Sequence, residues 1–167
     1  MRTVRVPYFT LNRRVVVASI PLRAEITPKV EHIFGNGQCR GLALALHEIL
    51  GWPIMGAYNS FSDDWRTKHY VLLTPTRLTA DINGIRCVDY SLRKTSPRAV
   101  RQPKPGWLPI SMELAEFYAP AIAAALRLQN DAIEKGLPKP RWTLCSEGYL
   151  PHPDSAAPVA NLATREA

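Results

Sequence analysis

The stretch "GNGQCRGLALALHEILGWP" (residues 35–53) decides the fold, because it places a cysteine where a glycine-rich turn gives way to a helix. From Cys39 to Leu50 the apolar residues recur at helical spacing, and alanine and leucine are strong helix formers. Gly51 and the proline two positions later end the pattern. The sequence predicts a helix that begins at Cys39. The cysteine is then either a nucleophile at the helix N-terminus or a small buried apolar residue.

The totals of the chain indicate one globular domain. It has 167 residues, of which 46% are apolar and 21% charged, enough for one hydrophobic core. We expect a single α+β domain over residues 1–150 and a poorly ordered tail over residues 151–167. No apolar run approaches the ~18–20 residues of a membrane span, and the N-terminus lacks the pattern of a signal peptide. A cytoplasmic protein without a membrane partner is therefore expected.

The cysteines argue against a metal site or a disulfide framework. Cys39, Cys87 and Cys145 are odd in number, widely spaced and free of any CxxC pair. Cys87, read as mid-strand, and Cys145, in a proline-flanked loop, are interpreted as structural. We expect free thiols, no metal and no organic cofactor.

Charge suggests a possible anionic partner. The formal net charge is +7, but the basic residues are dispersed rather than gathered in an arginine-rich run with aromatics. Residues 93–104 are the densest basic segment. Binding of nucleic acid is therefore a secondary possibility beside a protein or peptide substrate.

The remaining pattern indicates strands before the long C-terminal helix. We expect strands at residues 2–7, 13–19, 53–59 and 69–75, a hairpin over residues 76–90 with its turn at Asn83-Gly84, and a turn-prone segment over residues 26–37. We expect a polar loop over residues 60–68, which holds Asp63, Asp64 and Trp65, a loop or extended arm over residues 93–110, and a helix over residues 111–135. Ser111 is its expected N-cap, Pro120 is expected to kink or interrupt it, and Gly136 is its expected stop.

Three side chains occur in an order that suits nucleophilic catalysis. Cys39 opens a helix, where free amide donors and the helix dipole stabilise a thiolate. His69 begins a strand and can move the thiol proton to a leaving group. Asp81 lies on the next strand and can orient the imidazole.

Other side chains compete for these roles. Asp89 is the alternative third member, and Asp81 is preferred because it lies on the strand directly after that of His69. His47 is about 12 Å along the helix from Cys39 at 1.5 Å per residue, so it is interpreted as a packing or surface histidine. His32 precedes the turn without a partner pattern, and His152 lies between two prolines.

The order resembles the papain-like cysteine peptidase superfamily in its compact forms, namely NlpC-type cell-wall peptidases and transglutaminase-like bacterial or phage domains. "GNGQCRGLALAL" is similar to the Gly-Gln-Cys opening of transglutaminase-type helices, and "HYVLLTPTRLTADINGIR" to their histidine strand and following aspartate. Arg40 stands where transglutaminases carry tryptophan. The resemblance implies a Cys-bearing helix packed on an antiparallel sheet, with Cys39 as nucleophile, His69 as base and Asp81 as orienting acid.

The sequence favours two functions. The first is a thiol hydrolase or acyl transferase acting on an amide, peptide or isopeptide bond. Its oxyanion would be held by the Cys39 N–H and by Gln38, or else Asn36. The second is a catalytically inactive papain-like binding module whose basic face binds nucleic acid or an acidic protein. A small phage or mobile-element protein that acts on a host protein is a further possibility.

Overall fold

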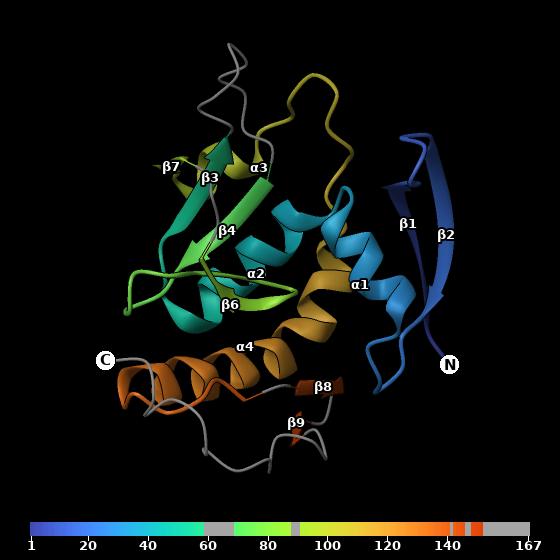
Figure 1. Ribbon diagram of the computed structural model, residues 1–167. Helices are drawn as coiled ribbons and strands as arrows, with labels where there is room; N and C mark the ends of the chain where they lie inside the picture. The colour runs from blue at the N-terminus through green and yellow to red at the C-terminus, as the bar shows by residue number, and fades with distance from the viewer. Residues whose placement is uncertain (59–68, 88–90, 141, 146–147, 152–167) are drawn as a thin grey trace.

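A computed structural model describes residues 1–58, 69–87 and 91–140, and the backbone of residues 142–145 and 148–151. Its centre is a five-stranded antiparallel sheet in the order β6-β5-β4-β3-β7 (Figure 1). The strands are β3 (Ile54–Tyr58), β4 (His69–Leu73), β5 (Thr79–Asp81), β6 (Gly84–Arg86) and β7 (Ser91–Lys94). Together with the helices, this sheet confirms the α+β class.

Helix α2 (Cys39–Leu50) confirms the expected helix at both ends. Gly51 adopts the left-handed conformation at its C-terminus, with φ of 69°, and donates its N–H to the carbonyl of His47 at 2.8 Å. This is the geometry for which glycine is favoured over other residues. Helix α2 packs against β4 of the sheet and against α4 (Met112–Glu134), so it lies at the centre of the molecule (Figure 1).

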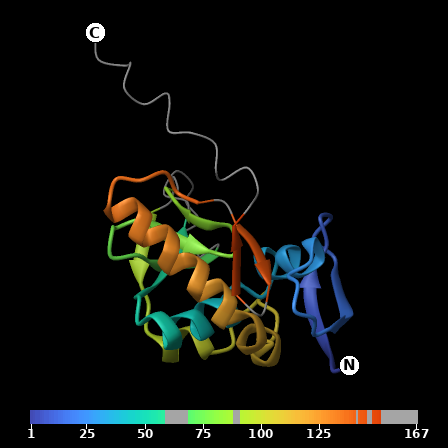
Figure 2. The same cartoon turned by 90° about the horizontal axis from the view of Figure 1, so that it is seen from below.

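The N-terminal residues form a separate hairpin. Strands β1 (Thr3–Phe9) and β2 (Val15–Pro21) pair with each other and not with the central sheet, and Figure 2 shows them at one side of the molecule. Helix α1 (Pro28–Gly35) follows, where the sequence predicted only a turn-prone segment. That prediction was wrong because Pro28 is tolerated at the start of a helix, and Thr27 caps it by accepting the N–H of Val30.

The C-terminal half holds more regular structure than expected. Residues 93–110 are not all loop, because β7 ends at Lys94 and helix α3 (Pro97–Arg101) follows it. Helix α4 runs through Pro120 without a break, and its axis bends in Figure 1. The side chain of Ser111 makes no cap hydrogen bond to it. Strands β8 (Trp142–Cys145) and β9 (Gly148–Pro151) form a two-stranded sheet that the sequence did not predict. The expected tail falls outside the described residues from 152 onwards.

One hydrophobic core joins these layers. It includes Val6 of the hairpin, Leu46 of α2, Leu72 of β4 and Leu126 of α4, all of them buried. Each such side chain stabilises the fold by about 1.5–3 kcal/mol. In the described part of the chain, no helix has both the length and the apolar character needed to cross a membrane.

Candidate active site

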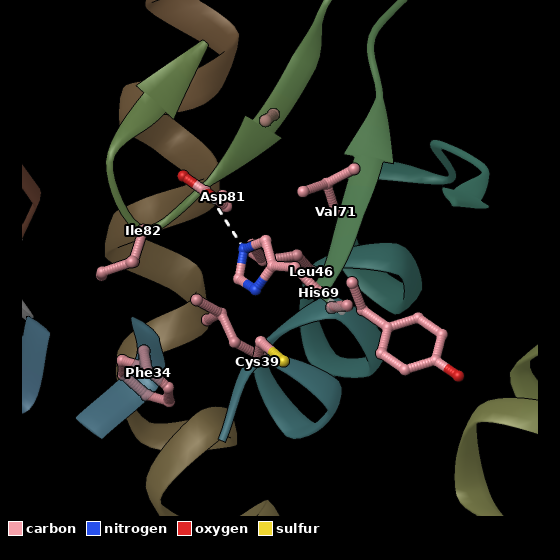
Figure 3. A pocket seen from close by; sticks show the side chains of 11 residues that line it. Phe34, Cys39, Leu46, His69, Val71, Asp81 and Ile82 are labelled. Carbon is pink, nitrogen blue, oxygen red and sulfur yellow. Dashed lines mark hydrogen bonds and ion pairs between the residues drawn. The ribbon is translucent and has the colours of Figure 1, made fainter. Parts of the chain in front are cut away.

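The sheet brings His69 and Asp81 together. Strands β4 and β5 are antiparallel, with Leu72 opposite Ala80, and this register continued places Asp81 two positions diagonally from His69 on the same face. The His69 Nε2 lies 2.9 Å from the Asp81 Oδ2. Because a carboxylate can only accept, Nε2 carries the proton and Nδ1 is left for another partner. Figure 3 shows that second ring nitrogen on the side of Cys39.

Cys39 reaches the same place from the helix. Cys39, His69 and Asp81 line one small space of about 10 Å³ beneath the N-terminus of α2, which is about the room that one water needs (Figure 3). Packing of α2 on β4 thus brings together Cys39 and His69, which are 30 positions apart in the sequence. The sulfur is nearly shielded, because Cys39 is only 5% exposed.

Asp81 is held as a carboxylate. It is buried, which raises its pKa, but the hydrogen bond and charge of His69, the Asn83 N–H at 2.8 Å and the charge of Arg86 together lower the pKa below its ordinary value. The Arg86 Nη2 lies 3.0 Å from the same Oδ2 that accepts from His69. The loop between β5 and β6 is Ile82 and Asn83, one position before the expected Asn83-Gly84 turn, because Asp81 caps it through the Asn83 N–H.

His69 is held as an imidazolium. Burial lowers its pKa, but the hydrogen-bonding interactions with Asp81 and Cys39, and the negative charges of both, raise the pKa to about 10. At neutral pH this places a cation between two groups that carry or can carry negative charge.

The predicted oxyanion side chains have other bonds. The Gln38 Nε2 donates to the carbonyls of Pro7 at 2.8 Å and Pro109 at 3.0 Å, and its Oε1 accepts the N–H of Ser111. Gln38 therefore ties the hairpin to the start of α4, and both of its N–H donors are engaged.

Asn36 is engaged in a similar way. Its Nδ2 donates to the His32 carbonyl at 2.9 Å and lies 3.3 Å from the His32 Nδ1, while the His32 Nε2 donates to the Phe9 carbonyl. The side chain of Gln38, the N-cap residue of α2, makes no capping hydrogen bond to this helix. The donors best placed for an oxyanion are thus the first-turn backbone amides of α2, beginning with that of Cys39.

A buried arginine next to the cysteine was not predicted as a site residue. Arg40 is 2% exposed, and its Nε donates to the Val100 carbonyl at 2.9 Å, while its Nη2 donates to the carbonyls of Val100 and Gln102. The guanidinium also lies over the ring of Trp107, 5.6 Å from the ring centre. Burial lowers its pKa, which the charges of Tyr70 and Cys39 raise in part. An arginine inside an apolar helical run was the available signal.

The remaining candidates lie elsewhere. The His47 Nδ1 bonds the Trp52 carbonyl at the far end of α2, as expected for a packing histidine. Cys87 follows the end of β6 and is exposed, so its mid-strand assignment was wrong. Asp89, His152, Asp63, Asp64 and Trp65 fall outside the described residues, as does the side chain of Cys145.

In the described ranges, no group of three or more His, Cys, Asp and Glu side chains is arranged to hold a metal ion. Comparisons of the chain with protein-family models, with curated proteins and with solved structures found no match.

Proposed function

We propose that this protein is a thiol-dependent hydrolase or acyl transferase with a papain-like arrangement, acting on an amide, peptide or isopeptide bond. The observation that carries the proposal is the convergence of Cys39, His69 and Asp81 on one enclosed space, with His69 bonded to Asp81 through Nε2. A helix that begins at the cysteine and packs on an antiparallel sheet also supports it.

The proposed reaction needs only these groups and the α2 amides. The Cys39 thiolate attacks the carbonyl carbon, a C–S bond forms, and the oxygen takes the negative charge beside the first-turn amides. The His69 imidazolium then gives its proton to the leaving nitrogen as the C–N bond breaks, leaving a thioester. Water or an amine attacks the thioester and gives a proton to His69, and the C–S bond breaks to restore the thiolate.

Iodoacetamide labelling tests the proposal, because alkylation consumes the thiolate. Protein is treated between pH 5 and pH 9 and the modified cysteines are mapped by mass spectrometry. Cys87 is the internal reference, since it is exposed and outside the site. We expect Cys39 to react faster than Cys87 below pH 7 despite its burial. Slower reaction of Cys39 than of Cys87 at every pH contradicts the proposal.

The binding-module alternative has weaker support. Part of the basic segment is already paired, since Arg101 lies 2.9 Å from Glu48 and the Lys104 Nζ donates to the Tyr70 hydroxyl. Salt-sensitive DNA binding that survives Cys39→Ala would favour this alternative over catalysis.

A further inference from the structure

Access to Cys39 is provided by a second, larger hollow. A cleft of about 600 Å³ lies between the tip of the β1–β2 hairpin, the turn that joins α1 to α2, and the segment before α4. Its lining residues are Phe9, Thr10, Leu11, Arg13, Gly35, Asn36, Gly37, Cys39, Gly106 and Trp107. Cys39 lines both this cleft and the small space that it shares with His69. A molecule in the cleft therefore lies against Cys39.

The cleft lining combines apolar surface with one ionised group. Phe9, Leu11 and Trp107 supply the apolar part. Gly37 has a φ of 128°, and an added Cβ there would lie 2.8 Å from the side chain of Leu108, in the segment before α4, and 3.5 Å from Phe9 of the hairpin, so the turn comes close to both. Among the described residues that line the cleft, Arg13 is the one with a charged side chain, and none carries a carboxylate.

Arg13 is presented to the cleft by the hairpin loop. Its backbone is left-handed, with φ of 56°, which is uncommon for a residue other than glycine. Two hydrogen bonds close the loop, from the Arg13 N–H to the Thr10 carbonyl at 2.8 Å and from the Thr10 N–H to the Arg14 carbonyl at 2.9 Å. Across the described ranges, no carboxylate lies within ion-pair distance of the Arg13 guanidinium. The loop thus holds an unpaired cation beside the route to Cys39.

We propose that the cleft binds a peptide segment that carries an acidic side chain next to an apolar one, with Arg13 pairing with the carboxylate. This inference rests on the proposed function, since it names the substrate class of the same site. A peptide fits better than a nucleic acid, because a phosphate backbone is bound by several cations and this lining has one. The apolar residues would accept the neighbouring side chain, and Arg13 would set the preference for charge.

Peptide aldehydes test the proposal, because they cover the thiol reversibly without needing a known substrate. The probes are acetylated Leu-Leu-Gly aldehydes in which Asp replaces each residue in turn, each with an Asn counterpart of equal shape. Their protection of Cys39 from iodoacetamide is measured in wild type, Arg13→Gln, Arg13→Lys and Arg14→Gln. Arg14 is the matched control, since it is exposed, adjacent and outside the lining.

We expect at least one Asp aldehyde to protect wild-type Cys39 at about fivefold lower concentration than its Asn counterpart, as an accessible ion pair provides. Arg13→Gln should remove that advantage, while Arg13→Lys and Arg14→Gln keep it. Equal protection by every pair, no protection by any aldehyde, or an advantage that survives Arg13→Gln overturns the inference while Cys39 is still alkylated. Arg13-dependent protection by oligothymidylate in place of the Asp aldehydes also overturns it. Failure of Cys39 to alkylate contradicts the proposed function itself.

Discussion

Two cationic side chains, the half-buried His69 and the buried Arg40, lie near Cys39, and they are stabilised in different ways. On the sheet side, His69 faces the Asp81 carboxylate at 2.9 Å. On α2, Arg40 faces backbone carbonyls of the wall segment, which we define as residues 100–107, and the ring of Trp107. The imidazole ring of His69, which is hydrogen-bonded to a carboxylate, can gain and lose a proton. A guanidinium cannot, so it serves as a fixed clamp.

The difference assigns separate tasks to the two sides. His69 is suited to proton transfer, because Asp81 orients the ring and leaves Nδ1 for Cys39. Arg40 holds the wall segment against α2, and that segment carries the Trp107 that lines the cleft. Changes on the sheet side should therefore alter the chemistry of Cys39, whereas changes to Arg40 should alter the stability of the wall.

Removal of the base has the largest expected effect. His69→Ala should lower the alkylation rate of Cys39 at pH 6 by roughly 100-fold or more, since only the thiolate is alkylated and a free cysteine, with a pKa of about 8.5, is less than about 1% thiolate at that pH. The rate is measured with iodoacetamide in a Cys87→Ser background. His47→Ala is the matched control, because His47 lies on the same helix but bonds the Trp52 carbonyl. Equal alkylation rates of Cys39 in wild type and His69→Ala would show that His69 does not influence the reactivity of Cys39.

Loss of the clamp should mainly affect folding. Arg40→Met leaves the buried carbonyl of Val100 and the part-buried carbonyl of Gln102 without their donors, so we expect the free energy of unfolding to fall by about 3 kcal/mol. Arg40→Lys keeps a charge but lacks the planar fork, and we expect a loss of about 1–2 kcal/mol. Urea denaturation measures both. A variant Arg40→Met as stable as the wild type would show that the wall segment does not depend on this clamp.

The same contrast explains what the sequence could predict. The cluster of Cys39, His69 and Asp81 was predictable because each has a local signal: a helix start, a strand start and the next strand of a hairpin. The clamp was not predictable, because the carbonyls that Arg40 binds lie 60 and 62 residues away. Every residue carries a backbone carbonyl, so the acceptors of such bonds cannot be recognised from the residue types in a sequence.

The role of Gln38 was also beyond the sequence. By resemblance, a glutamine before a nucleophilic cysteine suggests an oxyanion donor. The amide of Gln38 is instead hydrogen-bonded to the backbone of Pro7, Pro109 and Ser111. Helix α1 was missed for another reason, since Pro28 was weighed as a turn residue and not as the first residue of a helix. The bonds of Gln38 therefore depend on residues distant in the sequence, which the local pattern does not reveal.

The pH dependence of stability measures the charge on His69 directly. The pKa of His69 in the fold, about 10, lies above the ordinary 6.5 of an unfolded histidine. The stabilisation from its protonation is then complete below pH 6.5 and is lost as pH rises through 10. The lowered pKa of Asp81 keeps its carboxylate charged throughout that window, so the loss belongs to His69.

We therefore expect wild type to exceed His69→Gln in unfolding free energy at pH 6, and this excess to shrink by about 4 kcal/mol by pH 10. Urea denaturation at several pH values measures the difference, in which titrations common to both proteins cancel. An Asp81→Asn background removes one of the two partners that raise the pKa of His69, so there the excess should shrink less between pH 6 and pH 10. An excess that is constant from pH 6 to pH 10 in the presence of Asp81 would mean that the fold does not raise the pKa of His69. Arg40 would then be the one remaining cation of the pair above pH 7, and the contrast between the two cations would be lost.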